Sequence, residues 1–132
     1  MRALLDTHVF IWWIVDSLQL PRRVREIITD GDNELFLSAA SCWEIAIKAG
    51  LGTITLPAHP DRFIVEQMAL NAVQALPVEA SHALHVFHLP TIHRDPFDRI
   101  LIAQALLEGI PIITSDALIG KYKVRTIWDK KL

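Results

Sequence analysis

Four acidic residues occupy positions from which their side chains could meet in one site: Asp6, Glu44, Asp98 and Asp116. Asp6 and Asp116 each follow a short, largely apolar run that is typical of a buried strand. Glu44 and Asp98 each open an apolar stretch that is typical of a helix. In an open α/β sheet, ligands bind outside the carboxyl ends of the strands where the strand order reverses. We therefore expect the four acids to converge in such a crevice.

Converging carboxylates favour one class of ligand. Like charges held close together raise one another's pKa unless a cation compensates for them. The pattern therefore predicts a divalent-metal site. Oxygen ligands of this kind suit Mg²⁺ or Mn²⁺ and are a poor basis for selecting Zn²⁺.

Each acid also has a simpler interpretation when it is taken alone. Asp6 and Asp116 can act as ordinary helix caps. Ser41 and Glu44 have the spacing of a capping box, and Asp98 suits the positive end of a helix dipole. The two interpretations are compatible, because a residue that caps a helix can still point an oxygen at a metal.

Composition narrows the class of protein. The 132 residues suit one domain over residues 1–132 with a real core, and the hydrophobic fraction of 52% argues against disorder. A net charge of −2 argues against a broadly basic nucleic-acid binder, so contact with an anionic polymer needs a local patch or a bound cation. The single cysteine indicates a reducing compartment. No signal peptide is recognisable and charges interrupt every apolar run, so we expect a cytoplasmic protein.

Strand-like and helix-like segments alternate along the chain. Such alternation predicts an α/β fold with a parallel sheet covered on both faces. The expected strands are residues 2–5, 35–37, 72–76, 110–114 and 124–128, and the expected helices are residues 7–15, 21–28, 41–50, 63–70, 79–88 and 95–107. Gly109 is the expected stop of the longest helix.

Four motifs in this order carry a family resemblance. They are LLDTH (4–8), SCWEIAIK (41–48), HRDPFDRILIAQA (93–105) and ITSD (113–116). Together they resemble the PIN-domain family over nearly the whole chain. The block at 93–105 particularly resembles the VapC-type toxins of bacterial type II toxin–antitoxin systems.

The resemblance implies a three-layer α/β/α sandwich around a central parallel five-stranded sheet of order 3-2-1-4-5. It also implies an endoribonuclease that depends on Mg²⁺ or Mn²⁺, a homodimer, and a partner antitoxin that neutralises the toxin. Position by position, the acids of the family fall on Asp6, Glu44, Asp98 and Asp116, with Asp95 as a fifth candidate. The implied strand order places the first and fourth strands side by side, which brings together the strand ends that Asp6 and Asp116 follow.

These residues would have different roles in phosphodiester hydrolysis. Asp6, Asp98 and Asp116 are the first choices for direct or water-bridged metal contact, and Glu44 would orient the attacking water. The product would carry a 5′ phosphate. Sequence does not decide between one metal ion and two.

Neighbouring polar residues have both a functional and a structural interpretation. Thr7 and Ser115 adjoin the acids and are candidate donors to them or to substrate, or simply helix-start hydroxyls. Arg99 is a candidate contact for a phosphate or an antitoxin carboxylate, or a member of a surface ion pair.

Other residue patterns are given less weight. His82, His85 and His88 recur at a spacing that would suit a zinc site with His93, but a polar helix face with packed imidazoles is favoured. Cys42 is interpreted as a core residue rather than a nucleophile. Two basic clusters are candidate RNA contacts or solvated surface: Arg22, Arg23 and Arg25 in one, and Lys121, Lys123, Arg125, Lys130 and Lys131 in the other.

Apolar residues exceed the obvious needs of one small core. Trp12, Trp13, Phe63 and Met68 are mostly assigned to the core, and some are candidates for a groove that holds an antitoxin helix or a second copy of the chain.

The favoured hypothesis is a metal-dependent ribonuclease toxin. One alternative is a receiver-like phospho-acceptor domain, although receiver domains usually show paired acids after the first strand and Asp6 is followed by Thr7 and His8. The other is a catalytically silent RNA-binding module. The identity of the RNA and of the antitoxin is not encoded in any of these motifs.

Overall fold

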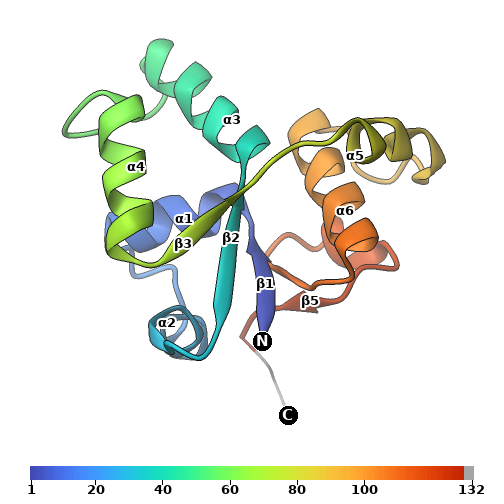
Figure 1. Ribbon diagram of the computed structural model, residues 1–132, viewed down its shortest axis with the longest axis horizontal. Helices are drawn as coiled ribbons and strands as arrows, with labels where there is room; N and C mark the ends of the chain where they lie inside the picture. The colour runs from blue at the N-terminus through green and yellow to red at the C-terminus, as the bar shows by residue number, and fades with distance from the viewer. Residues whose placement is uncertain (130–132) are drawn as a thin grey trace.

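A computed structural model describes residues 1–129 and contains a five-stranded parallel sheet of order β3-β2-β1-β4-β5 (Figure 1). The strands are β1 (Arg2–Leu5), β2 (Glu34–Ser38), β3 (Val73–Leu76), β4 (Ile112–Ile113) and β5 (Thr126–Ile127). The helices are α1 (Thr7–Ile14), α2 (Arg22–Thr29), α3 (Ala39–Gly50), α4 (Pro60–Leu70), α5 (Ala80–His85) and α6 (Pro96–Glu108), and the 3-10 turns are η1 (Val86–His88) and η2 (Ile119–Lys121). The predicted strand order is confirmed.

Two apolar layers lie on opposite faces of this sheet, because successive strand residues point to opposite sides. In β2, Leu35 and Leu37 belong to one buried cluster and Phe36 belongs to the other. Helices α1, α2 and α4 supply the first cluster together with Ile45 of α3, whereas α6 and η2 supply the second. The fold is therefore the predicted three-layer α/β/α sandwich.

The two halves of the sheet are paired to different extents. β1 and β2 share four residue pairs, and β2 and β3 also share four. β1 and β4 share two, as do β4 and β5. The strand order reverses between β1 and β4, so the carboxyl ends of these two strands lie side by side.

The start of α3 differs from the prediction. The helix begins two residues before Ser41, and Ser38 caps it by accepting a hydrogen bond from a backbone N–H of the first turn. The side chain of Ser41 instead accepts a hydrogen bond from the hydroxyl of Thr7 at 2.7 Å. The capping-box interpretation of Glu44 is therefore wrong. The physical reason is that β2 runs directly into α3, so the last strand residue is already the cap.

Other boundaries differ by smaller amounts. β4 and β5 are shorter than the ranges 110–114 and 124–128. Pro21 occupies the cap position of α2 rather than its first turn, and the helix expected over residues 79–88 is divided into α5 and η1.

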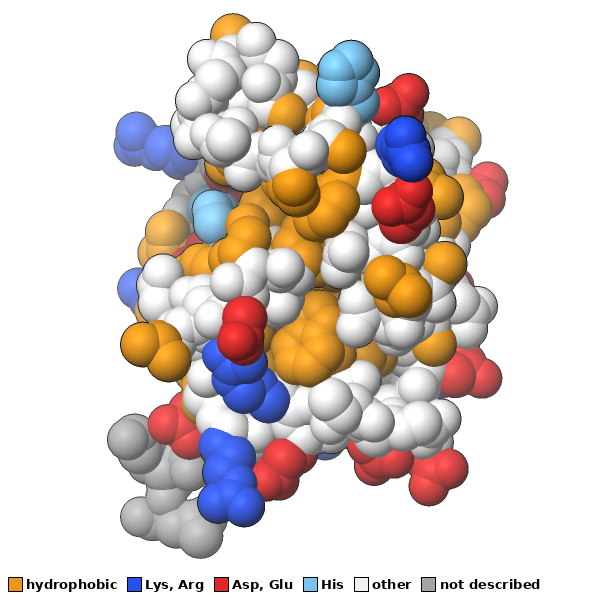
Figure 2. Space-filling model, turned by 90° about the vertical axis from the view of Figure 1, so that its left-hand side faces the viewer, with side chains coloured by type: hydrophobic (Ala, Val, Ile, Leu, Met, Phe, Trp, Pro, Cys, Tyr) orange, Lys and Arg blue, Asp and Glu red, His pale blue; other side chains and the backbone are white. Residues whose placement is uncertain are grey.

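The surplus apolar residues are mainly part of the core or packed against it. Trp12, Trp13 and Phe63 pack against the first buried cluster, and Met68 belongs to it. Figure 2 shows the α4 side of the molecule, where apolar side chains gather in the middle and charged side chains surround them. Within residues 1–129, none of the helices combines the length and apolar character that a membrane crossing requires.

The two ends of α6 are fixed by the residues that the sequence predicts. At the start, Asp95 accepts hydrogen bonds from the backbone N–H groups of Phe97 and Asp98. At the end, Gly109 adopts the left-handed conformation with φ 68° and ψ 35°. Because glycine has no Cβ, it accepts this conformation without strain.

Replacing Gly109 by alanine is expected to destabilise the protein. A Cβ at position 109 would meet no atom within 4 Å, so the cost comes from the backbone conformation alone. We expect a loss of about 1 kcal/mol and a fall in melting temperature of about 3–6 °C in thermal unfolding. Gly31→Ala is the matched control, because Gly31 also has open space but lies outside the left-handed region. Equal melting temperatures for the two variants would contradict this account.

Candidate metal centre

The carboxyl ends of β1 and β4 bring acidic side chains from four segments toward one edge of the sheet. Asp6 directly follows β1 and caps α1, and Asp116 lies three residues after the end of β4. Asp98 stands in the first turn of α6, and Glu44 lies in the second turn of α3. α3 contacts both α1 and α6, which brings these helix ends together.

Asp6 is held by hydrogen bonds on both carboxylate oxygens. Its Oδ1 accepts from the backbone N–H of His8 at 3.1 Å, and its Oδ2 accepts from the hydroxyl of Thr114 at 2.6 Å. Burial alone would raise the pKa of this carboxyl, but hydrogen bonds from the His8 side chain, Thr114 and the His8 backbone outweigh it. The pKa of Asp6 is therefore lowered, so the side chain stays ionised.

Asp98 and Asp116 meet at one imidazole nitrogen. The Nε2 atom of His93 lies 3.1 Å from Oδ2 of Asp98 and 2.8 Å from Oδ2 of Asp116. Ligand atoms of these three residues all lie within 4.8 Å of one another. His93 and Asp98 are each 8% exposed, so the cluster is largely shielded from water.

The charge on Asp98 is costly in this setting. Burial raises its pKa, and the negative charges of Asp6 and Asp95 raise it further, to about 7. The nearby His93 lowers the pKa and the charge of Glu44 raises it, but both effects are smaller. A carboxyl that is half protonated near neutral pH marks a site with more negative charge than its surroundings compensate.

Glu44 has one oxygen paired and one without a partner. Its Oε2 forms an ion pair with Nζ of Lys48 at 2.8 Å, and this interaction raises the pKa of Lys48. Its Oε1 is fully buried and has no hydrogen-bond partner among the described residues. Buried carboxylate oxygens normally have a partner, so an additional ligand is expected beside Oε1.

The donor set fits a hard divalent cation. Its acidic members supply carboxylate oxygens, which Mg²⁺ and Mn²⁺ prefer. A cation among them would offset the repulsion that raises the pKa of Asp98 and would give the unpartnered oxygen of Glu44 a ligand, directly or through water.

The remaining predicted site residues have varied positions. Thr7 is buried and bonds Ser41, whereas Ser115 is exposed. Asp95 caps α6 and is close enough to Asp98 to raise its pKa. Arg99 donates to three backbone carbonyl groups and lies 3.3 Å from the hydroxyl of Tyr122, so its guanidinium supports the loop before α6.

Three residues of the site were not identified from the sequence. Thr114, rather than Ser115, contacts Asp6, because Thr114 is buried and Ser115 is exposed. Lys48 pairs with Glu44 at a spacing of four residues, which a charge-pattern search along the helix would have found. The position of His93 near the other histidines suggests a zinc ligand or a packed imidazole, and nothing in the sequence indicates that it meets Asp98 and Asp116.

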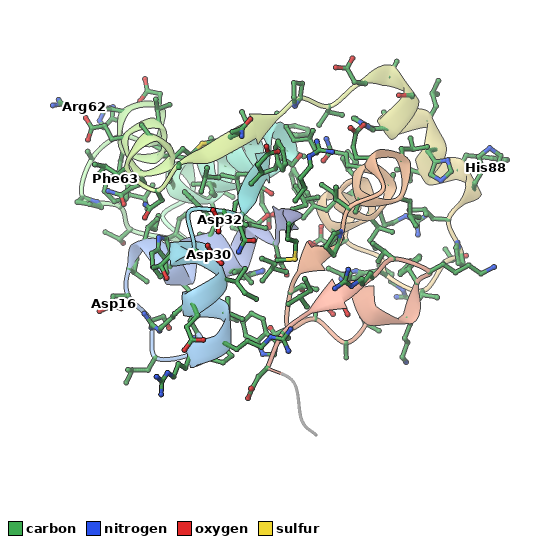
Figure 3. All side chains as sticks on the ribbon, turned by 60° about the horizontal axis from the view of Figure 1, so that its bottom comes forward. Asp16, Asp30, Asp32, Arg62, Phe63 and His88 are labelled. Carbon is green, nitrogen blue, oxygen red and sulfur yellow. The ribbon has the colours of Figure 1, made fainter. Side chains whose placement is uncertain are left out.

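The other histidines do not converge on a metal. Within residues 1–129, the single cluster with metal-ligand geometry is the one at His93. His82 is buried and bonds Glu108, while His85 and His88 contact each other's rings, and His88 lies at the outer edge of the molecule (Figure 3). This agrees with the packed-imidazole interpretation.

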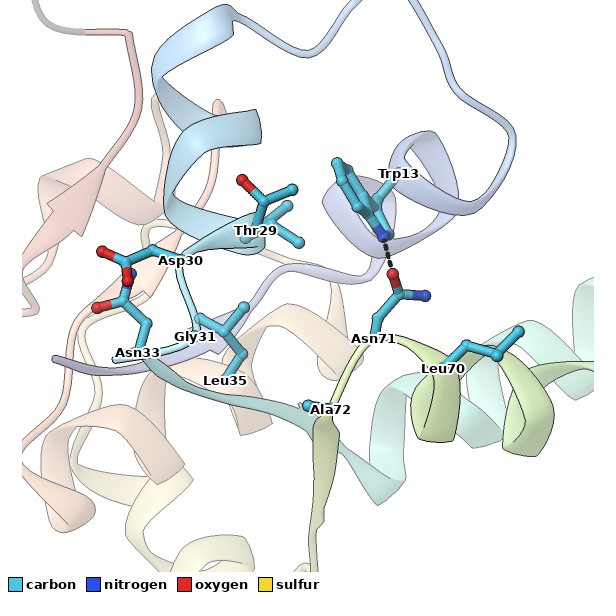
Figure 4. A pocket seen from close by; sticks show the side chains of 10 residues that line it. Trp13, Thr29, Asp30, Gly31, Asn33, Leu35, Leu70, Asn71 and Ala72 are labelled. Carbon is cyan, nitrogen blue, oxygen red and sulfur yellow. Dashed lines mark hydrogen bonds between the residues drawn. The ribbon is translucent and has the colours of Figure 1, made fainter.

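A separate hollow of about 330 Å³ lies at the opposite end of the sheet (Figure 4). Trp13 and Asn71 bond across its wall at 2.8 Å. Asp30 is the single carboxylate among its lining residues, and it stands with Asp32 on the turn before β2 (Figure 3). This hollow therefore lacks the converging acids of the metal centre.

The two basic clusters predicted from the sequence have different surroundings. Arg22 and Arg25 form ion pairs with Glu26 and Asp16, which favours the structural interpretation of the first cluster. In the second cluster, Lys121, Lys123 and Arg125 are exposed, and Lys130 and Lys131 lie outside the described residues.

Comparison with known proteins gives consistent results. A family model described as PIN domain matches residues 3–124. Ribonuclease VapC22 of Mycobacterium tuberculosis is 31% identical over 122 residues, which is 92% of each chain. Ribonuclease VapC16 of the same organism is 36% identical over 61 residues, which is 46% of this chain and 43% of that protein.

Solved structures share the fold at lower sequence identity. The VapBC2 complex of Rickettsia felis bound to a promoter DNA fragment gives a TM-score of 0.72 at 14% identity, covering 98% of this chain and 100% of that chain. DNA-bound VapBC from Salmonella typhimurium gives a TM-score of 0.68 at 17% identity, covering 96% and 97%.

Removing the charge of Asp98 is expected to stabilise the metal-free protein. The folded-state pKa of about 7 exceeds the ordinary value of 3.8, so the folded chain binds more protons than the unfolded chain between these values. Stability therefore falls as the pH rises from about 4 to 7. In EDTA at pH 8, Asp98→Asn should raise the free energy of unfolding by roughly 1–3 kcal/mol, and at pH 4 the gain should disappear.

The matched control is Asp61→Asn. Asp61 also stands in the first turn of a helix that begins with proline, but it is exposed. Denaturant unfolding at both pH values measures the two variants. An unchanged or lower stability of Asp98→Asn at pH 8 would show that the carboxylates do not repel one another as described.

Proposed function

This chain belongs to the PIN domain family, and from that premise we propose that it is a metal-dependent endoribonuclease that acts as the toxin of a type II toxin–antitoxin pair. In this proposal, it hydrolyses RNA phosphodiester bonds with Mg²⁺ or Mn²⁺ and thereby arrests translation and growth. The names of its relatives, ribonucleases VapC22 and VapC16, support the reaction class.

The main support is the uncompensated charge at the ends of β1 and β4. Asp98 carries a pKa of about 7, and a buried oxygen of Glu44 has no partner among the described residues. Both features are costs to the folded protein that a divalent cation would relieve. A silent RNA-binding module would not require converging carboxylates, and a receiver-like domain would usually have paired acids after the first strand, where this chain has Asp6 followed by Thr7 and His8.

Asp6, Asp98 and Asp116 would hold the cation, which when bound supplies Lewis-acid polarisation of a phosphate oxygen. Thr114 and the backbone of His8 fix the orientation of Asp6. Asp116 is fixed in turn, because its Oδ1 accepts from the backbone N–H of Leu118 at 2.8 Å.

Glu44 would orient the attacking water. Lys48 occupies one of its oxygens, which leaves Oε1 to accept a hydrogen bond from the water. The water oxygen attacks phosphorus in line as the bond from phosphorus to the 3′ oxygen breaks. The water gives up one proton and the 3′ oxygen takes one up, so the products are a 3′ hydroxyl and a 5′ phosphate.

We further propose that an antitoxin and a second copy of the chain are partners. The structural neighbours are VapBC complexes by name, which supports an antitoxin partner. Exposed Trp43 and Ile47 of α3 and Leu51 at its C-cap recur at four-residue spacing and provide an apolar strip that a protein partner can cover. An antitoxin that places a basic side chain among the acids would displace the cation.

Loss of the carboxylates should abolish RNA cleavage. We expect purified protein to cut RNA in Mn²⁺ or Mg²⁺ and to lose this activity in EDTA. Asp6→Asn should reduce the cleavage rate at least about 100-fold, because Asp6 would hold the cation and a direct ligand matters more than an outer residue, whose loss costs about 10–100-fold. Glu44→Gln should reduce the rate about 10–100-fold, as expected for an outer residue that orients the water. Asp61→Asn should retain full activity, since Asp61 is an exposed acid outside the centre.

Mapping the cleaved ends tests the chemistry as well as the rate. Products with 5′ phosphates are expected, and expression in growing cells should arrest growth for the parent chain and for Asp61→Asn only. Cleavage that survives EDTA, or RNA binding without any cleavage, would refute the proposal; the second result would favour the silent RNA-binding module. Labelling by acetyl phosphate without cleavage would favour the receiver-like alternative.

A further inference from the structure

His93 carries two side-chain interactions that together fix its protonation pattern. Its Nδ1 accepts a hydrogen bond from the backbone N–H of Asp95 at 3.1 Å. A nitrogen that accepts an N–H carries no proton of its own, so the proton of the neutral ring lies on Nε2. That nitrogen faces Asp98 and Asp116 at 3.1 and 2.8 Å.

The position of the ring proton distinguishes two possible roles of the imidazole, which are metal ligand and hydrogen-bond donor. A histidine ligand must direct an unprotonated nitrogen at the metal. Here the nitrogen that faces the carboxylates is the donor, and the unprotonated one is engaged by the backbone next to α6. In its observed position, His93 is therefore arranged to donate to the carboxylates rather than to bind a cation.

The backbone of His93 is held as firmly as its ring. Its N–H donates to the hydroxyl of Tyr122 at 2.8 Å, and its carbonyl accepts from Arg99 at 3.3 Å. Tyr122 in turn donates to the carbonyl of Pro90 at 2.9 Å. These contacts come from α6 and from the segment after η2, so the ring is placed by elements on both sides of the site.

We propose that His93 is a positioning residue of the metal centre. Its Nε2–H donates to Asp116, and the same nitrogen lies 3.1 Å from Asp98, so the imidazole holds the two carboxylates at convergent positions before the cation arrives. Each carboxylate has about four lone-pair positions, so donation to one oxygen leaves others for the metal. This inference rests on the proposed metal-dependent function and adds a residue outside the carboxylate set to it.

The chain contains a matched control for this role. His82 is also buried, its Nδ1 accepts the backbone N–H of Glu79 at 2.9 Å, and its Nε2 lies 3.0 Å from Glu108. It ties α5 to α6 and does not belong to the His93 cluster. A substitution at His82 therefore removes the same kind of hydrogen bonds without touching the metal centre.

The first test is nitrogen NMR on the metal-free protein. We expect the ring of His93 to carry its proton on Nε2, with His93→Gln identifying the signal by its loss. The opposite tautomer, with the proton on Nδ1, would overturn the proposal. This measurement requires neither a metal nor an RNA.

The second test measures Mn²⁺ binding by electron paramagnetic resonance. His93→Ala should weaken Mn²⁺ affinity about 10–100-fold, as expected for loss of a residue that orients ligands. His93→Gln, whose amide can still donate, should recover part of the loss, whereas His82→Gln should bind as the parent chain does. Melting temperatures of the variants separate weakened binding from weakened folding.

The same spectra distinguish a donor from a ligand. Electron spin echo modulation of Mn²⁺-loaded parent protein should show no directly bonded nitrogen. A directly bonded nitrogen, or unchanged affinity in His93→Ala, would overturn the positioning role while leaving the proposed function intact. Failure of the parent protein to bind Mn²⁺ would overturn both proposals.

Discussion

Repulsion among buried carboxylates is the constraint on which this structure depends. The chain brings acids from four segments to one edge of a parallel sheet, and two of them, Asp6 and Asp98, respond in opposite directions. Hydrogen bonds keep Asp6 ionised, whereas burial and neighbouring charge raise the pKa of Asp98 to about 7. Acids that lower the stability of the folded protein are typical of a functional site, because binding or catalysis often requires groups that do not favour folding.

Hydrogen-bond donors and a cation close to the carboxylates reduce this repulsion. Thr114 and a backbone N–H donate to Asp6, and Lys48 pairs with one oxygen of Glu44. His93 bonds Asp116 and lies 3.1 Å from Asp98. Each donor is placed by an element that is also required for packing, so the polar site is built on the same strands and helices as the core. The apolar layers on the two faces of the sheet hold these elements in place, and the acids lie at the carboxyl ends of the strands.

Much of this arrangement was predictable from the sequence, and the reasons for the failures are physical. Acids after apolar runs, Asp95 before a proline and Gly109 after an apolar helix all carry local signals, and the family resemblance supplied the strand order. The start of α3 was misplaced because Ser38 and Ser41 are both good caps, and only the direct passage from β2 into the helix decides between them. Partners such as His93 depend on contacts between segments 23 residues apart, which no local pattern encodes.

The uneven pairing of the sheet has a mechanical consequence. β1, β2 and β3 form a ladder with four residue pairs at each junction, whereas β4 joins β1 through only two. Asp6 and Asp116 stand on opposite sides of that narrow junction. A ligand that binds both would link the two strands across one of the two narrowest junctions of the sheet, so filling the site would also hold the two halves of the sheet together.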